Sequence, residues 1–212
     1  MTARVDWIVV GGPAEPWLGL GLVAAAEDED GRQLVPMFGT GVEIDTTSQL
    51  GMRRLVLSGI DGDITEIDGV PIEVRDAAPP MFADHPLGVS HIDHVVIATD
   101  DLARTCGSIA DVTGAPLKRV REAGEIRQGF HRVGGPGGLI VEVVERSGLA
   151  PDSASLWGFV FVVDDIHGAC RTLGPDVISE PRDAVQPGRF IATVRSGVGL
   201  GVPLALMSPD LR

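Results

Sequence analysis

Two apolar stretches of the chain each carry one ionisable residue that could do chemistry. Glu142 lies within residues 139–145, and His94 lies within residues 92–98. An ionised carboxylate among apolar neighbours is costly unless it is paired, hydrogen-bonded or bound to a metal. Glu142 therefore indicates either a salt bridge to an arginine or a functional site. His94 is either a hydrogen-bonded core residue or a ligand.

Both stretches have the length and composition of strands, and strand periodicity predicts which way the two side chains point. Residues two positions apart share one face of a strand. The face of His94 is then expected to include Ile92, Val96 and Ala98, and that of Glu142 to include Ile140 and Val144. An inward-facing pair of His94 and Glu142 follows if both of these faces line one cleft.

The stretch around His94 occurs twice in the chain. Residues 92–106 and 156–170 align at a constant offset of 64, with the coincidences Val96/Val160, Asp100/Asp164, Asp101/Asp165 and Cys106/Cys170. Each copy is an apolar strand that ends in Asp-Asp, which suits a helix N-cap with a second carboxylate in the first turn. Each copy is therefore expected to begin with a strand followed by a short helix.

Three further strands are predicted after each helix. They are residues 117–121, 126–133 and 139–145 in the first copy, and 176–180, 189–195 and 203–207 in the second. The glycine-rich stretches 134–138 and 197–201 lie between strands and precede no helix, so they indicate hairpin turns rather than phosphate-binding loops. The order is β, α, β, β, β in both module one, residues 90–146, and module two, residues 155–209.

This pattern resembles the vicinal oxygen chelate superfamily of glyoxalases, bleomycin-resistance proteins and dioxygenases. The motifs that carry the resemblance are Ile92-Asp-His-Val-Val-Ile-Ala-Thr-Asp-Asp-Leu102, Leu139-Ile-Val-Glu-Val-Val-Glu145 and Phe159-Val-Phe-Val-Val-Asp-Asp-Ile166, and they span about 120 of the 212 residues. The resemblance implies an α+β, glyoxalase-like fold. Its tandem βαβββ modules would form a U-shaped, partly closed sheet around a small-molecule cleft.

The resemblance also implies a site for a divalent metal, held by a His on the first strand and a Glu on the last strand of each module. Module one keeps both, as His94 and Glu142, and Glu142 could serve as ligand or base. Such ligands suit zinc, iron, manganese, nickel or cobalt. Module two has Gly158 and Ala205 instead, so half of the ligand set is absent. A third ligand would have to come from His131, from His85 or Asp84, or from the substrate.

Module two offers candidates for ligand binding without a metal. Trp157, Phe159 and Phe161 fall on one face of its first strand, which is either a strand-on-helix core or an apolar wall for a ligand. Gly158 falls on the other face, and it would leave room for a larger substrate if that face lines the cleft.

Arginines on the middle strands of the two modules are further candidates. Arg127 and Arg132 in module one, and Arg189 and Arg195 in module two, could bind a carboxylate or phosphate of a ligand through two hydrogen bonds. The alternative for each is a solvated surface position. Arg127 or Arg132 could instead pair with Glu142.

Residues 1–87 show no copy of the repeated pattern. Their short apolar segments, with turns at 61–63 and 68–69, predict a small β-rich N-terminal domain. Residues 76–86 indicate a linker, because X-Pro steps favour extended chain. The glyoxalase-like domain would then occupy residues 88–212.

Composition limits the partners of the chain. Asp and Glu number 30 against 17 Lys and Arg, a net charge of −13, so the long-range field opposes nucleic acid and anionic membranes. The apolar runs are broken well short of the roughly 20 residues that a spanning helix needs, and the N-terminus lacks a secretory signal pattern. We therefore expect a cytoplasmic protein. Cys106 and Cys170 are too few for a disulfide framework and are expected to be buried thiols.

Three functional classes fit these observations. The first is a metal-free protein that binds a small molecule in its cleft, similar to bleomycin-resistance members of the family. The second is a metal-dependent lyase, isomerase or ring-cleaving dioxygenase that uses His94 and Glu142. The third is a scaffold that serves only association. Whether the chain is an enzyme, and whether it is a monomer or a homodimer, stay open from the sequence.

Overall fold

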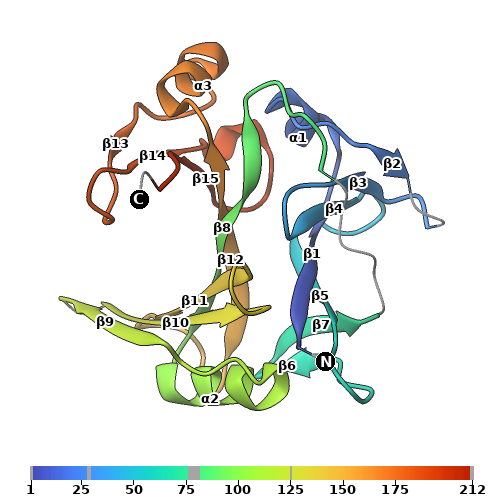
Figure 1. Cartoon of the computed structure of the whole chain (residues 1–212), viewed down its shortest axis with the longest axis vertical. Coiled ribbons are helices and arrows are strands. Elements are labelled where there is room, and N and C mark those ends of the chain that lie inside the picture. Colours follow the sequence, from blue (N-terminus) through green and yellow to red (C-terminus); the bar gives the residue numbers. More distant parts are fainter. Residues whose placement is uncertain (1, 28–29, 76–81, 125, 211–212) are drawn as a thin grey trace.

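The computed structural model describes residues 2–27, 30–75, 82–124 and 126–210, and these residues form two mixed β-sheets (Figure 1). Most of the linker expected at residues 76–86 lies outside the described residues. The two sheets stand next to each other and share one hydrophobic core. In the described ranges no helix is both long and apolar enough to cross a membrane.

The C-terminal sheet confirms the two predicted βαβββ modules. Module one contains β8 (Val89–Thr99), α2 (Leu102–Thr113), β9 (Arg119–Ala123), β10 (Ile126–Val133) and β11 (Leu139–Glu145). Module two contains β12 (Ala154–Val163), α3 (Ile166–Leu173), β13 (Arg182–Asp183), β14 (Phe190–Thr193) and β15 (Leu204–Met207), with a 3-10 helix at Ser196–Val198. The strand order is β13-β14-β15-β12-β8-β11-β10-β9.

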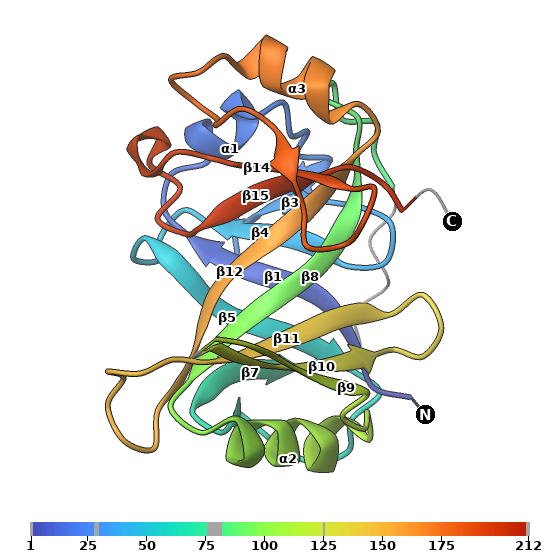
Figure 2. The same cartoon turned by 90° about the vertical axis from the view of Figure 1, so that its left-hand side faces the viewer.

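The pairing within this sheet makes it a two-armed structure. In each module the first and last strands are parallel neighbours, β8 with β11 and β12 with β15, and β8 and β12 pair antiparallel at the centre. From the central pair of β8 and β12 the other strands extend as two arms, β9–β11 and β13–β15. Both arms lie on the side away from the N-terminal sheet (Figures 1 and 2). The sheet is open and does not close into a barrel.

An aspartate caps each helix as the Asp-Asp pattern predicts, but the second Asp of each pair is the cap, so the carboxylate expected in the first turn is absent. Asp101 accepts a hydrogen bond from the Arg104 backbone N–H at 3.0 Å, and Asp165 accepts one from the Gly168 N–H at 2.9 Å. Each cap satisfies one of the N–H groups that a helix leaves unpaired at its start. The second strand of module two is the exception to the predicted elements. Residues 176–180 contribute only one bridge, between Ile178 and Val194, and a two-residue β13 follows.

The N-terminal sheet corrects the expectation that the first 87 residues do not repeat the pattern. It contains β1 (Arg4–Gly11), α1 (Glu15–Gly19), β2 (Ala26–Glu27), β3 (Gln33–Val35), β4 (Gly41–Asp45), β5 (Gly51–Ser58), β6 (Glu66–Ile67) and β7 (Val70–Val74). Its order is β2-β3-β4-β1-β5-β7-β6, with β1 parallel to β4, β5 parallel to β7, and β1 antiparallel to β5. This is one complete βαβββ unit followed by a shortened unit that lacks the helix and one strand.

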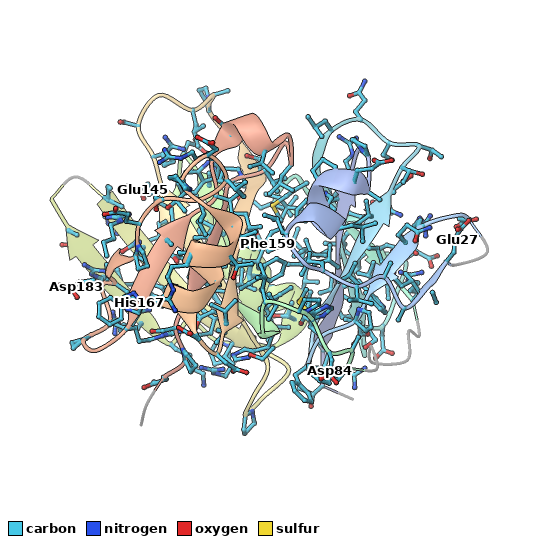
Figure 3. The ribbon with its side chains drawn as sticks, turned by 90° about the horizontal axis from the view of Figure 1, so that it is seen from above. Glu27, Asp84, Glu145, Phe159, His167 and Asp183 are labelled. Carbon is cyan, nitrogen blue, oxygen red and sulfur yellow. The ribbon has the colours of Figure 1, made fainter. Side chains whose placement is uncertain are left out.

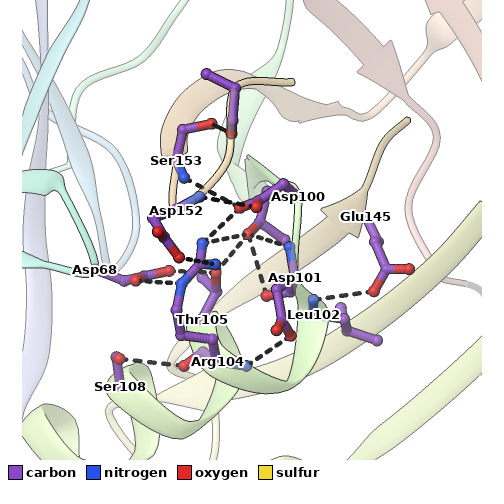
Figure 4. Close-up of polar contacts among 12 residues, drawn as sticks. Asp68, Asp100, Asp101, Leu102, Arg104, Thr105, Ser108, Glu145, Asp152 and Ser153 are labelled. Atoms are coloured by element: carbon purple, nitrogen blue, oxygen red, sulfur yellow. Dashed lines mark hydrogen bonds and ion pairs between the residues drawn. The ribbon is translucent and has the colours of Figure 1, made fainter. Parts of the chain in front are cut away.

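Aromatic and charged contacts join the two sheets. The rings of Trp17 on α1 and Phe159 on β12 stack with centroids 6.0 Å apart, and Phe161 packs edge-on against Phe159 at 5.3 Å. Figure 3 shows Phe159 between the two halves. At one end, Arg104 of α2 donates to Asp68 in the turn between β6 and β7 at 2.8 Å and to Asp100 at 2.7 Å (Figure 4).

Candidate functional site

A cleft of about 770 Å³ is lined by residues from both arms of the C-terminal sheet. Its polar side is formed by Asp93 and His94 of β8, Gln128 of β10 and Glu142 of β11. Its apolar side is formed by residues of module two, among them Ile191 and Met207. The predicted pair His94 and Glu142 therefore does converge in one cleft.

A β-bulge on β8 brings two consecutive residues, Asp93 and His94, to this cleft. Ile92 pairs with Phe161 and His94 pairs with Val160, so Asp93 is the extra residue without a partner on β12. A bulge of this kind breaks the alternation of faces and re-aims the side chains next to it. The expectation that Ile92 shares a face with His94 is wrong for this reason, because Ile92 is 5% exposed and belongs to the core between the sheets.

A continuous chain of polar contacts crosses the floor of the cleft. Arg189 Nη1 lies 2.7 Å from Asp93 Oδ1, and Asp93 Oδ2 lies 2.7 Å from His94 Nδ1. His94 Nε2 lies 3.3 Å from Glu142 Oε2. The Gln128 amide donates to the other Glu142 oxygen at 2.5 Å. Glu142, expected to pair with Arg127 or Arg132 if it is structural, instead has His94 and Gln128 as its partners.

Asp93 is held in its ionised form. Burial by itself would raise the pKa of this carboxyl group, but the hydrogen bond and charge of His94, together with the ion pair with Arg189, outweigh it and lower the pKa to about 2. An ionised Asp93 fixes the orientation of the imidazole through Nδ1. The other ring nitrogen, Nε2, is then directed at Glu142 and the cleft.

The residues present do not make a complete metal site. His94 and Glu142 supply two ligands, whereas an open catalytic site normally has three from the protein. Glu142 pairs with Val96 in module one, and Ala205 pairs with Val160, the counterpart of Val96, in module two. Ala205 is therefore the equivalent of Glu142, and it has no side-chain atom that could bind a metal. Among the described residues no group of three or more His, Cys, Asp or Glu side chains is placed to hold a metal ion.

None of the candidates for a third ligand completes this site. His131 is among the residues that line the cleft, but its imidazole is directed elsewhere. The side chain of His131 projects from the opposite face of β10, toward α2, where Nδ1 lies 2.9 Å from the Ala115 carbonyl oxygen and burial lowers the pKa of the ring. Its Nε2 is buried without a hydrogen-bond partner among the described residues. His85 contacts the Pro36 carbonyl oxygen and the Val23 N–H in the N-terminal half. Asp84 is not part of the cleft lining.

The aromatic candidates of module two are divided by the bulged pairing of β12 with β8. Phe159 and Phe161 are 2% and 1% exposed and lie in the core between the sheets, without access to the cleft. Trp157 is exposed and lies under the guanidinium of Arg146, 4.8 Å from the ring centroid. Gly158 is not an opening for a substrate, since a Cβ added there would collide with the Pro203 backbone.

Two of the four candidate arginines line the cleft and two do not. Arg189 is part of the site, and Arg132 lines the cleft while donating to the Gly138 carbonyl oxygen. Arg127 pairs with Glu145 and Glu122 and is absent from the cleft lining. Arg195 donates to the Pro175 carbonyl oxygen, also outside the cleft.

Sequence reasoning missed Asp93 and Gln128. Strict alternation assigns Asp93 to the face opposite His94. No residue type in this stretch predicts the bulge that directs the Asp93 side chain to the cleft. Gln128 had a signal that could have been used. The turn at 134–138 sets a register in which Phe130 pairs with Glu142. Gln128 lies two residues before Phe130 and therefore shares its face of the strand.

No family model matches the chain, and no curated protein matches its sequence. Solved structures do match its fold. A mutant of 4-hydroxymandelate synthase from Streptomyces coelicolor matches at a TM-score of 0.65 and 13% identity, over 98% of this chain and 92% of that one. Methylmalonyl-CoA epimerase from Mycobacterium tuberculosis matches at 0.50 and 20% identity, over 61% and 93%. A fusion of a xylose isomerase-like TIM barrel with 4-hydroxyphenylpyruvate dioxygenase matches at 0.68 and 10% identity, over 99% and 49%.

These likenesses are to members of the vicinal oxygen chelate superfamily, and the chain has the fold of that superfamily. Two of the matches extend over nearly the whole chain, so they include the N-terminal sheet as well as the two predicted modules. At these identities the likeness concerns the fold alone.

Proposed function

We propose that this chain is a small-molecule-binding protein of the vicinal oxygen chelate fold, whose ligand occupies the cleft between modules one and two without a resident metal. One observation carries the proposal. His94 and Glu142 are held by Asp93 and Gln128 on one side of the cleft, while the opposite side includes the apolar residues Ile191 and Met207. A ligand can thus be oriented by hydrogen bonds on one side and packed on the other.

A specific observation favours a second candidate, a metal-dependent enzyme of lyase, isomerase or ring-cleaving dioxygenase type. A carboxylate that holds one imidazole nitrogen while the other faces an open position is the usual support of a metal-binding His, and Asp93 holds His94 in this way. In such an enzyme His94 and Glu142 would hold the metal, and the substrate would have to supply the missing donors. The metal would polarise an oxygen of the substrate.

Metal analysis and ligand binding separate the two candidates. The protein is purified without chelators, its metal content is measured, and a small-molecule panel is screened by melting temperature with and without EDTA. We expect less than stoichiometric metal, and ligand-induced stabilisation that EDTA does not change. Glu142→Gln should weaken ligand binding about tenfold, because it removes a charged hydrogen-bond acceptor.

Glu122→Gln is the matched control, because Glu122 is exposed on β9 and is not part of the cleft lining. It should bind ligands as the unaltered protein does. Stoichiometric metal that is lost in both His94→Ala and Glu142→Ala would replace the proposal by the metal-dependent enzyme.

A further inference from the structure

Positive charge is concentrated in the cleft of an acidic protein. The chain has 17 Lys and Arg against 30 Asp and Glu, yet among the described residues six basic and four acidic side chains line this cleft. The basic residues are Lys118, Arg119, Arg121, Arg132, Arg182 and Arg189. A concave surface lined by one sign of charge concentrates ligands of the opposite sign.

Three of these basic side chains make no ion pair, side-chain hydrogen bond or ring contact within the described part of the chain. Arg189 is paired with Asp93, Arg119 lies over the ring of Phe130 at 5.3 Å, and Arg132 bonds the Gly138 carbonyl oxygen. Lys118, Arg121 and Arg182 make no such contact. We call these three residues the rim.

The rim spans both arms of the sheet. Arg121 stands opposite Gln128 in the pairing of β9 with β10, so its side chain shares the face of β10 that lines the cleft. Lys118 precedes β9, and Arg182 begins β13 in the other module. Because β9 and β13 are the two outer strands of the sheet (Figure 2), the rim lies on the outer parts of the arms, while Asp93 and His94 lie on the central strand β8.

The floor of the cleft has the opposite character. Glu142 would repel a second negative charge placed beside it, and the only basic side chain among the floor contacts, Arg189, is 8% exposed and already paired with Asp93. Ala184, Ile191 and Met207 line the cleft in module two and belong to or pack against one apolar cluster. An anionic group therefore fits the rim, and an apolar segment fits module two.

We infer that the ligand of this cleft is an amphipathic anion. It carries a phosphate or carboxylate group that binds Lys118, Arg121 and Arg182, and an apolar body that packs on Ala184, Ile191 and Met207. This inference rests on the proposed function and adds to it the class of ligand and its orientation. The end of the ligand opposite the anionic group then reaches His94 and Glu142.

Three six-carbon probes test the inference by calorimetry: hexyl phosphate, hexanoate and 1-hexanol. They share one apolar body and differ in the head group. We expect at least one of the two anions to bind about tenfold or more tightly than hexanol, because guanidinium–anion hydrogen bonds are charge-assisted. The tighter of the two anions identifies the head group as phosphate or carboxylate. Binding of that anion should weaken as salt is raised, because the rim is exposed to solvent.

Substitutions locate the anion. Arg121→Gln and Arg182→Gln, one in each arm, should each weaken binding of the preferred anion several-fold and leave binding of hexanol unchanged. Arg171→Gln is the matched control, since Arg171 is exposed on α3 outside the cleft and removes the same charge. The two rim variants are in different modules, so misfolding of one, checked by circular dichroism, still leaves the other as a test.

Each other outcome overturns the inference. Equal binding of hexanol and both anions, or anion binding that both rim variants retain, would leave a cleft that binds small molecules without using the rim. Binding of none of the three probes would also overturn it. The proposed function is judged separately, by the broad panel and the Glu142→Gln variant, so its failure is recognised independently of these probes.

Discussion

At the scale of single residues, Asp93 determines what the cleft can do. It pairs with Arg189, which is 8% exposed, and it holds Nδ1 of His94. A buried ion pair stabilises little by itself, but removal of one partner is costly because the other charge stays buried without compensation. Asp93 therefore supports both the local fold and the orientation of the imidazole.

Asp93→Asn should lower the free energy of unfolding by about 3 kcal/mol at mildly acidic to neutral pH, chiefly because the Arg189 charge loses its partner. Because folding lowers the pKa of Asp93 from 3.8 to about 2, its contribution to stability is fully present above the unfolded value and is lost as pH falls through the folded value. Urea unfolding of both proteins between about pH 2 and pH 6 measures this difference.

Asp183→Asn is the control for this prediction. Asp183 also lines the cleft, but it is exposed on β13 at the outer edge of an arm (Figure 3), so its substitution should leave stability nearly unchanged. A difference between the unaltered protein and Asp93→Asn that does not diminish at low pH would contradict the assigned role of the carboxylate.

At the scale of elements, Gly158 illustrates what the sequence could and could not predict. The offset of 64 makes it the counterpart of His94, and glycine is expected to leave room for a larger substrate if its face lines the cleft. The structure shows the reverse, because the Pro203 backbone occupies that space. β12 and β15 approach each other so closely here that only glycine fits. The same approach bars a histidine, so module two cannot regain its first metal ligand by one substitution.

Gly158→Ala should therefore destabilise the protein by about 2 kcal/mol, since the added methyl group overlaps backbone and β12 must shift from β15. Thermal unfolding measures the change. Gly197→Ala is the matched control, because a Cβ at Gly197 would meet no atom within 4 Å. If both variants melt together with the unaltered protein, β12 and β15 are not packed as closely as described.

The elements themselves were predictable where local chemistry decides them. Both helices begin at the Asp-Asp pairs, and the apolar first strands and the glycine-rich hairpin of module one appear where the sequence placed them. The bulge at Asp93 was not predictable, because it depends on how β8 pairs with a strand about 60 residues away. The short β13 was missed because the neighbouring residues 176–180 look more strand-like than Arg182 and Asp183 do.

At the scale of the whole molecule, the N-terminal sheet repeats the topology of the modules without repeating their sequence. Its helix α1 starts at Ala14 without a side-chain cap, so the Asp-Asp signal that revealed the other modules is absent. Trp7 and Glu43 occupy the register positions of His94 and Glu142. Trp7 covers Gly41, while Glu43 is buried and paired with Arg75. Because these positions hold a packed Trp and a buried ion pair, the sequence of the N-terminal sheet shows no motif like that of module one.

The two sheets are expected to unfold together, although the proposed domain boundary at residues 87 and 88 separates them along the chain. Phe159→Ala removes a ring that is 2% exposed and stacked on Trp17 of the other sheet. The cost should be about 3 to 4 kcal/mol. In a Trp157→Phe background, fluorescence reports only Trp7 and Trp17 of the N-terminal half, while circular dichroism reports both sheets.

We expect Phe159→Ala to move the fluorescence midpoint and the circular dichroism midpoint to lower denaturant together, because one core stabilises both sheets. Phe190→Ala is the control, since Phe190 lies partly exposed on β14, outside that core. A fluorescence midpoint that stays in place while the circular dichroism transition splits would mean that the N-terminal sheet is stable without its partner. The cleft could then be studied on residues 88–212 alone.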